Sequence, residues 1–215
     1  MSMMGKINKF LGLNIRQNRE GIFINQEKYM KNLLEKFGLT NSTKLRVPMA
    51  TDIKLTPSLD KPSVDQTLDR SMIGPLLYLT ISRPDIMFSV SNCVRYLSNT
   101  REPHFTAVKN IFRYLKGTIL LGLWYPSKNG LFVQAYSDAE LGGCNLDRKG
   151  TSGGCQLMDG KLDHVEDGNI EVHFMKTTHQ LADIFTKPLD GKSFVRILEG
   201  LGMIDGDSVP CKKGD

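Results

Sequence analysis

The sequence predicts an α+β fold, in which a β-hairpin is followed by a helical region and then by a mixed sheet with flanking helices. Apolar residues recur at helical spacing between residues 26 and 117, whereas after Gly122 they alternate as they do in strands. The chain has 215 residues, of which 40% are hydrophobic. It can therefore bury a sizeable core, as one large domain or two small ones.

The predicted hairpin lies at residues 10–24. Two β-prone runs, residues 10–15 and 21–24, flank the polar loop 16–20. Short apolar runs on either side of a polar loop favour antiparallel pairing. We therefore expect two paired strands to open the fold.

The first predicted helix covers residues 26–37. Asn25 precedes it as a candidate N-cap, and Gly38 follows it as a left-handed C-cap. Residues 40–62 are rich in Ser, Thr, Asp and Pro and lack a clear period, which indicates a long surface connector.

A second helix is expected up to residue 79, opened by a capping box at residues 63–66. Pro75 lies inside this pattern. An interior proline lacks the backbone N–H and clashes with the preceding turn, which costs about 3 kcal/mol. We therefore expect a kink or a break near Gly74.

Two further helices are expected, one restarted by residues 82–85 and one from Pro103 to Gly117. The second carries a basic stripe on the face opposite its apolar residues. The members of this stripe are Lys109, Arg113 and Lys116. The stripe is a candidate phosphate-backbone contact, and the alternative is an ordinary solvated helix face.

The last third of the chain favours strands. Residues 123–125, 131–136 and 153–158 predict an antiparallel meander, and residues 170–175 alternate as a fourth strand. Thr178 then caps a helix that ends before Pro188, and residues 194–201 form a last amphipathic helix. The tail after Gly202 is expected to be disordered.

Composition narrows the class of protein only modestly. There are 28 Lys and Arg residues against 23 Asp and Glu, a formal net charge of +5, which suits a polyanionic partner weakly. Cys93, Cys144, Cys155 and Cys211 are scattered, so neither a zinc ribbon nor a disulfide framework is indicated. The sequence has no candidate membrane span or signal peptide, and we expect an intracellular protein.

Asp138 is the first candidate site residue. In the run Tyr136-Ser137-Asp138-Ala139 it follows the apolar residues 131–133, so it lies at the end of an expected strand. A carboxylate held on a rigid strand suits Mg²⁺, which prefers oxygen ligands. The alternative is a turn residue without a ligand.

Asp183, in the helix expected after the last strand, is the second acid. Two-metal nucleases need several convergent carboxylates, and two are too few. Glu140 and Asp147 are nearby in sequence but fit solvated turn positions. No phosphate-binding loop and no nucleophile with a plausible base is present.

A series of short motifs runs along the chain from residue 10 to residue 188. They are Phe10-Leu11-Gly12-Leu13, Arg70-Ser71-Met72-Ile73-Gly74, Ser82-Arg83-Pro84-Asp85-Ile86, Arg113-Tyr114-Leu115-Lys116-Gly117-Thr118, Tyr136-Ser137-Asp138-Ala139, residues 148–153 and residues 180–188. In this order they closely resemble the Pol polyprotein of Ty1/copia-type retrotransposons of plants. The resemblance covers the chain to about residue 204, and the abrupt start suggests a piece of something longer.

The resemblance implies a division of the chain. Residues 1–117 are expected to be the distal reverse transcriptase, with a primer-grip-like hairpin and a thumb-like helical region. Residues 118–204 are expected to be a truncated ribonuclease H-like domain with a mixed sheet, and residues 205–215 a disordered tail. Asp138 matches the first catalytic carboxylate of ribonuclease H, and Asp183 matches the last.

The departures from the family pattern bear on activity. The Tyr-x-Asp-Asp turn that carries the polymerase aspartates is absent from the chain. The segment that carries a catalytic Glu and a catalytic Asp is also missing after residues 154–159, where residues 161–168 follow almost directly. Glu166 and Asp167 match the turn before the last strand and do not replace those acids.

The resemblance thus implies a fragment of an RNA-directed DNA polymerase and ribonuclease H that is catalytically incompetent alone. It implies Mg²⁺ held by Asp138 and Asp183, at a site weakened by the loss of two acids. The expected partner is an RNA:DNA hybrid or duplex nucleic acid, bound by Lys109, Arg113 and Lys116. The alternative is a non-enzymatic interaction fragment, or a translated pseudogene product, that pairs with an intact Pol chain. The expected location is the cytoplasm or the nucleus.

Overall fold

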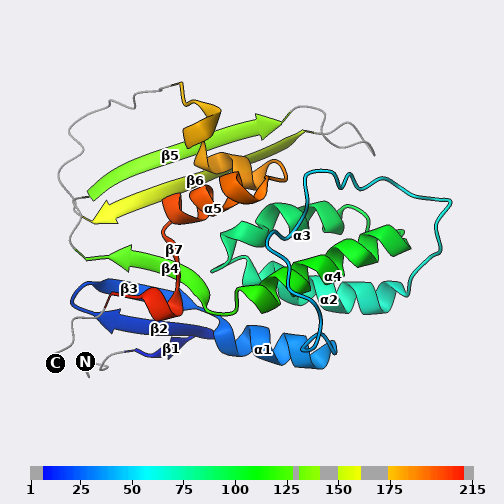
Figure 1. The fold of residues 1–215 in the computed structure, drawn as a ribbon, viewed down its shortest axis with the longest axis horizontal. Coiled ribbons are helices and arrows are strands. Elements are labelled where there is room, and N and C mark those ends of the chain that lie inside the picture. The colour runs from blue at the N-terminus through cyan, green and yellow to red at the C-terminus, as the bar shows by residue number, and fades with distance from the viewer. Residues whose placement is uncertain (1–6, 128–130, 141–149, 161–173, 211–215) are drawn as a thin grey trace.

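The computed structural model describes residues 7–127, 131–140, 150–160 and 174–210. Figure 1 shows antiparallel strands at both ends of the molecule with helices between and beside them. The predicted α+β class is confirmed. No helix within the described ranges is long and apolar enough to cross a membrane.

Five strands form an antiparallel sheet whose members come from three distant parts of the chain. The order across the sheet is β1, β2, β3, β4, β7. Their bounds are Lys9–Phe10, Leu13–Asn18, Gly21–Asn25, Leu121–Pro126 and Met203–Asp205. The division expected at residue 117 therefore does not coincide with a break in the sheet.

The hairpin expected at residues 10–24 is present as β2 and β3, with a shorter turn. Asn18 pairs with Gly21, and its side-chain oxygen accepts hydrogen bonds from the backbone N–H groups of Glu20 and Gly21 at 2.9 and 3.0 Å. An Asn that accepts from the backbone two residues on is typical of a tight turn. The polar residues 16–18, expected in the loop, belong to the strand.

The first expected strand is split in two at Leu11 and Gly12. Both residues have positive φ, 46° and 75°, and so reverse the chain between β1 and β2. The Tyr78 hydroxyl donates a hydrogen bond to the Leu11 carbonyl and holds this turn against α2, which covers Gln66–Leu79.

Strand β4 pairs with β3 and not with the strand that follows it, so the first strand of the expected meander is misplaced, whereas its second and third strands pair antiparallel as expected. Gly122 explains the close approach. A Cβ added there would lie 2.4 Å from the Ile24 carbonyl oxygen and 2.7 Å from the Phe23 ring. Phe23 is 1% exposed, so the missing side chain lets β4 pack over a core aromatic.

The tail expected to be disordered is ordered up to Pro210. Met203 pairs with Leu123 and is buried, and the short helix η4 (Gly206–Ser208) follows β7. The local sequence of β7 has no strong strand period. The strand forms because it pairs with β4, which lies far away in the sequence.

The helices follow the apolar periods closely. They are α1 (Glu27–Lys36), α2, η1 (Pro84–Ile86) leading into α3 (Met87–Val94), α4 (Glu102–Gly117) and α5 (Gly191–Gly200). Residues 40–62 contain no helix or strand, as expected of the connector.

Of the kink or break expected near Gly74, the break is wrong, because α2 continues through Pro75. Leu76 and Leu79, in the turn after the proline, are fully buried. Packing of this turn in the core offsets the backbone hydrogen bond that the proline cannot make.

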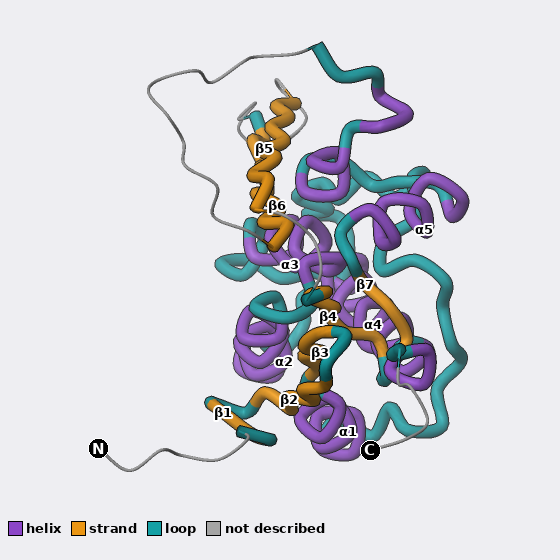
Figure 2. The backbone as a smooth tube through the Cα atoms, turned by 90° about the vertical axis from the view of Figure 1, so that its left-hand side faces the viewer, coloured by secondary structure: helices purple, strands orange, loops and turns teal. Residues whose placement is uncertain are grey.

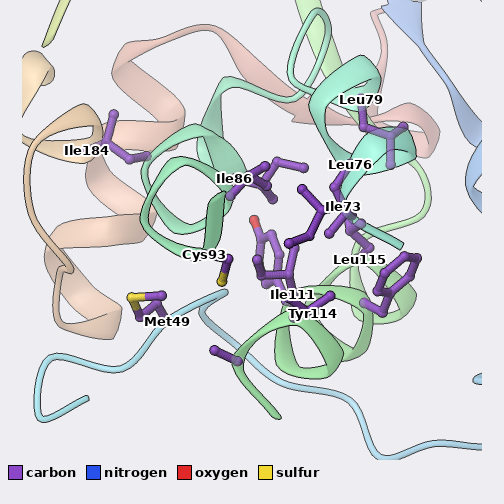
Figure 3. Packing of buried hydrophobic residues seen from close by; sticks show 14 of the residues in the cluster. Met49, Ile73, Leu76, Leu79, Ile86, Cys93, Ile111, Tyr114, Leu115 and Ile184 are labelled. Carbon is purple, nitrogen blue, oxygen red and sulfur yellow. The ribbon is translucent and has the colours of Figure 1, made fainter. Parts of the chain in front are cut away.

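One hydrophobic core joins the helices, and it extends from Met30 to Met203. Figure 3 shows side chains of α2, α3 and α4 pointing toward one another, with Met49 of the connector and Ile184 beside them. Ile86, Val90, Ile111 and Phe112, among others, are 0% exposed.

A buried polar network fixes the junction of η1 and α4. The Arg83 guanidinium donates to the Asp85 carboxylate at 2.7 and 3.0 Å, and both side chains are 0% exposed. The Tyr114 hydroxyl donates to Asp85 at 2.5 Å, and Arg83 also reaches the Thr118 hydroxyl and carbonyl at 2.7 and 2.9 Å. The motifs at residues 82–86 and 113–118 therefore meet in the interior, where their polar side chains hold η1 against α4.

The remaining strands, β5 (Leu131–Glu140) and β6 (Thr151–Gly160), form a separate two-stranded sheet. Figures 1 and 2 place this hairpin at the end of the molecule away from β1. In place of the helix expected from Thr178 there are two short 3₁₀ helices, η2 (Thr177–His179) and η3 (Leu181–Phe185). η3 contacts β5, β6, α3 and α5, so it joins the hairpin to the helical core. The fourth strand expected at residues 170–175 lies largely outside the described residues.

Candidate functional site

Asp138 lies near the end of β5, opposite Gly153 of β6. Its side chain is 24% exposed, and its Oδ2 accepts a hydrogen bond of 2.5 Å from the buried Thr186 hydroxyl. The predicted position at a strand end is thus confirmed. The carboxylate points toward the segment that follows η3 and not into a turn.

Asp183 lies in η3, and the structure brings it to Asp138. Its side chain is 4% exposed. The Lys187 ammonium lies 3.0 Å from Asp183 Oδ1 and 3.7 Å from Asp138 Oδ2, so one cation serves both acids. Two acids that are remote in sequence share a single site.

Local contacts explain why the two acids meet. The Gln180 side chain caps η3 by accepting from the Ala182 N–H at 3.2 Å, and its amide donates to the Ser137 carbonyl at 3.1 Å. Gln180 therefore ties the start of η3 to β5 at the residue next to Asp138.

Gly153 allows the hairpin to lie flat on η3. A Cβ at Gly153 would lie 2.4 Å from Phe185 Cβ, closer than such atoms approach. Because Gly153 pairs with Asp138, the contact that needs a glycine also sets the distance of Asp138 from η3.

The charges of the site balance one another. Burial raises the pKa of Asp183 above its ordinary 3.8, Lys187 partly opposes this, and Asp138 raises the pKa further. Burial lowers the pKa of Lys187, but the hydrogen bond and the charge of Asp183 outweigh burial and raise it. The ammonium therefore stays charged at neutral pH.

The residues present do not fit the implied Mg²⁺. Mg²⁺ demands near-octahedral oxygen coordination, whereas the carboxylates of Asp138 and Asp183 already receive hydrogen bonds from a hydroxyl and an ammonium. No group of three His, Cys, Asp or Glu side chains converges among the residues that the structure describes. Glu140 is exposed on the same strand, and Asp147 lies outside those residues.

The basic stripe on α4 is partly engaged by the protein itself. The Lys116 ammonium donates to the Ser42 carbonyl of the connector, and Arg113 donates to the Asn110 side chain at 2.7 Å. The Lys109 ammonium lies 4.3 Å from the centroid of the Phe105 ring. All three basic side chains are half-buried, so the stripe stabilises the connector and α4 besides any role with nucleic acid.

A basic groove, which sequence reasoning missed, lies between the connector and α5. It has a volume of about 1080 Å³, with Leu45, Gly117 and Val195 in its lining. Its charged lining consists of the cations Lys44, Arg46, Lys192 and Arg196 and the anions Asp190 and Glu199. These cations come from the connector and from α5, which are far apart in the sequence, so no local sequence pattern predicts the groove.

Lys187 and Thr186 were also missed by sequence reasoning, although both lie in the motif that contains Asp183. The spacing held a signal, because side chains four residues apart on a helical turn can form an ion pair. Lys187 stands four residues after Asp183. The contact of both residues with Asp138 depends on β5 and could not be read from that spacing.

Comparisons with known proteins agree with the motif series. The family model described as reverse transcriptase (RNA-dependent DNA polymerase) matches residues 1–51. The chain is 32% identical to an uncharacterized mitochondrial protein of Arabidopsis thaliana, AtMg00810, over 159 residues, which is 74% of this chain. It is 33% identical over 67% of its length to the retrovirus-related Pol polyprotein from transposon RE2 of the same plant. It is 30% identical over 71% of its length to that from transposon TNT 1-94 of Nicotiana tabacum.

The chain spans only part of these relatives. It covers 65% of the mitochondrial protein, and 10% and 12% of the two Pol polyproteins. No solved structure matches the chain.

Proposed function

The chain belongs to the family of retrovirus-related Pol polyproteins of copia-type transposons, and on this premise we propose that it is a catalytically incompetent Pol fragment that retains nucleic-acid binding. In this proposal residues 1–117 derive from the distal reverse transcriptase and residues 118–204 from a truncated ribonuclease H domain. The family match at residues 1–51 supports the first assignment. We expect the protein in the cytoplasm or the nucleus, where RNA and DNA occur.

The loss of nuclease activity is supported by the state of Asp138 and Asp183. Hydrolysis of a phosphodiester by two metal ions needs carboxylates that are free to hold those ions. Here the two acids are bridged by Lys187, and no third acid joins them among the described residues. The absence of a Tyr-x-Asp-Asp turn from these 215 residues supports the proposal that they do not add nucleotides on their own.

A ribonuclease H assay tests the first part of the proposal. The full chain is incubated with a labelled RNA:DNA hybrid and Mg²⁺, beside the Asp138→Asn variant. We expect the same background cleavage from both proteins. Cleavage by the wild-type chain that the variant abolishes would refute catalytic incompetence.

Binding of a hybrid or duplex is the second part of the proposal. We propose that Lys109, Arg113 and Lys116 contact phosphates, with the basic groove as a neighbouring source of cations. Each phosphate contact releases about one counterion, so the affinity falls steeply with salt between about 50 and 200 mM. A change of Lys109, Arg113 and Lys116 together to Ala should reduce the slope of log affinity against log salt by the amount that up to about three phosphate contacts contribute.

A groove variant separates the two basic surfaces. In it, Lys44, Arg46, Lys192 and Arg196 are changed to Ala, and this variant and the stripe variant are titrated with the same hybrid. A smaller salt dependence of the affinity in the stripe variant supports phosphate binding by the stripe. A smaller salt dependence in the groove variant alone would show that the groove, and not the stripe, binds the phosphates. An affinity of the wild-type chain that does not respond to salt would refute nucleic-acid binding altogether.

A further inference from the structure

Lys187 is held between two acids that belong to different parts of the fold. Asp138 comes from the β5–β6 hairpin, and Asp183 and Lys187 come from η3 and the residues after it. The ammonium is 3.0 Å from one carboxylate and 3.7 Å from the other. The Thr186 hydroxyl completes the cluster with its hydrogen bond to Asp138.

This arrangement differs from an ordinary surface ion pair. Exposed pairs contribute little, because water screens them and both side chains lose freedom. Here the side chain of Asp183 is 4% exposed and that of Asp138 is 24% exposed, and both face the same cation. Without that cation two carboxylates would face each other in a partly desolvated site, where like charges repel more strongly than in water.

The contacts of the cluster hold the hairpin on η3. The Thr186 hydroxyl and the Lys187 ammonium both reach Asp138 across this junction, and Gln180 and Gly153 fix the backbone beside them. A cation at this position is therefore part of the packing of β5 on η3. A second cation at this position would be repelled by the ammonium, so Lys187 disfavours a divalent ion there.

We infer that Lys187 is a resident cation that replaces a divalent metal between Asp138 and Asp183, and that its removal converts the pair into a divalent-cation site. The inference rests on the proposed origin of the two acids as metal ligands.

Thermal unfolding of the full chain in EDTA and in millimolar Mn²⁺ tests the inference. The wild-type melting temperature should be the same in both. Lys187→Met should melt several degrees lower in EDTA, because the two carboxylates then repel, and Mn²⁺ should restore most of the loss, because an ion that binds only the folded state stabilises it. Electron paramagnetic resonance of free Mn²⁺ should show binding to Lys187→Met roughly tenfold tighter than to the wild type.

Three variants assign the effect to the cluster. Lys187→Arg keeps the charge and should behave as the wild type. Asp138→Asn added to Lys187→Met should abolish the response to Mn²⁺. Lys28→Met, which removes an exposed lysine of α1, controls for a general change in net charge and should gain no Mn²⁺ response.

Equal Mn²⁺ affinity of the wild type and Lys187→Met would overturn the inference. If Lys187→Met does not fold, Lys187→Gln is measured in its place, since the amide can still donate to Asp183, and the same comparison decides. Nuclease activity of the wild type would refute the proposed function, whereas this inference is judged on Mn²⁺ binding and unfolding alone.

Discussion

Replacing Asp85 with Asn should destabilise the protein severely, because it removes a charge that balances a buried guanidinium. The change keeps the size of the side chain. It leaves Arg83, which is 0% exposed, beside a neutral amide whose NH₂ group cannot accept a hydrogen bond. Burial lowers the pKa of Arg83, but Asp85 outweighs burial and raises it, so the guanidinium remains charged and its loss of a partner is costly.

The contacts set the magnitude. Asp85 accepts from Arg83 at 2.7 and 3.0 Å and from the Tyr114 hydroxyl at 2.5 Å, and all three groups are buried. Removal of one partner of a buried ion pair costs about 3–5 kcal/mol. Native domains have only about 5–15 kcal/mol of stability in total. At roughly 2–4 °C per kcal/mol for a chain of this size, the melting temperature should fall by about 6–20 °C.

Urea unfolding followed by circular dichroism measures the effect, and two controls define it. Lys31→Ala breaks an exposed pair with Glu27, whose N···O distance is 2.6 Å, and should cost less than about 1 kcal/mol. The double variant Arg83→Met with Asp85→Leu replaces both charges with apolar groups and should cost less than Asp85→Asn alone.

A cost of less than about 1 kcal/mol for Asp85→Asn would show that the change leaves no uncompensated buried charge. A double variant that costs as much as Asp85→Asn alone would also contradict this expectation, since removal of both charges leaves no unpaired buried charge.

Three further changes have clear expected outcomes. Asp69→Asn should stabilise the protein at pH 7 and lose this advantage as the pH falls toward 3.8. Burial raises the pKa of Asp69, so the folded state is most stable when this carboxyl is protonated and loses stability as the pH rises through the raised pKa. Urea unfolding across this pH range measures the difference. Gly153→Ala should cost about 1–3 kcal/mol in urea unfolding because the new Cβ clashes with Phe185, whereas Gly154→Ala, whose Cβ would lie 3.1 Å from a carbonyl oxygen, should have a smaller effect. Gly74→Ala should raise stability by about 0.5–1 kcal/mol, because the site is helical and open, and an unchanged melting temperature would contradict this.

Local patterns predicted most of the helices and the two hairpins β2–β3 and β5–β6, but not the partners of β4. The helix expected at residues 26–37 and the one from Pro103 to Gly117 correspond to α1 and α4, since helical spacing of apolar residues shows which face is buried. Strand partners depend on contacts far along the chain. The pairing of β4 with β3 depends on Gly122 lying over Phe23, and no short window of sequence contains both.

The residues of the candidate site likewise fall into two groups, those that sequence motifs identify and those that only the structure shows. Motif order identified Asp138 and Asp183, and the structure brings them to one place. It could not identify Lys187 as their shared cation, because that role requires β5 to lie against η3. The basic groove was missed for the same reason, since its cations come from the connector and from α5.

Residue order alone was enough to identify the family, the α+β class, the positions of the main helices and the lack of a Tyr-x-Asp-Asp turn. These properties depend on residue identity, order and short-range period. The tertiary structure alone decided which strands pair, that Arg83 and Asp85 are an internal ion pair, and that Lys187 lies between two acids. These contacts escape a local pattern because charge and packing act over a few ångströms in space, whatever the distance along the chain.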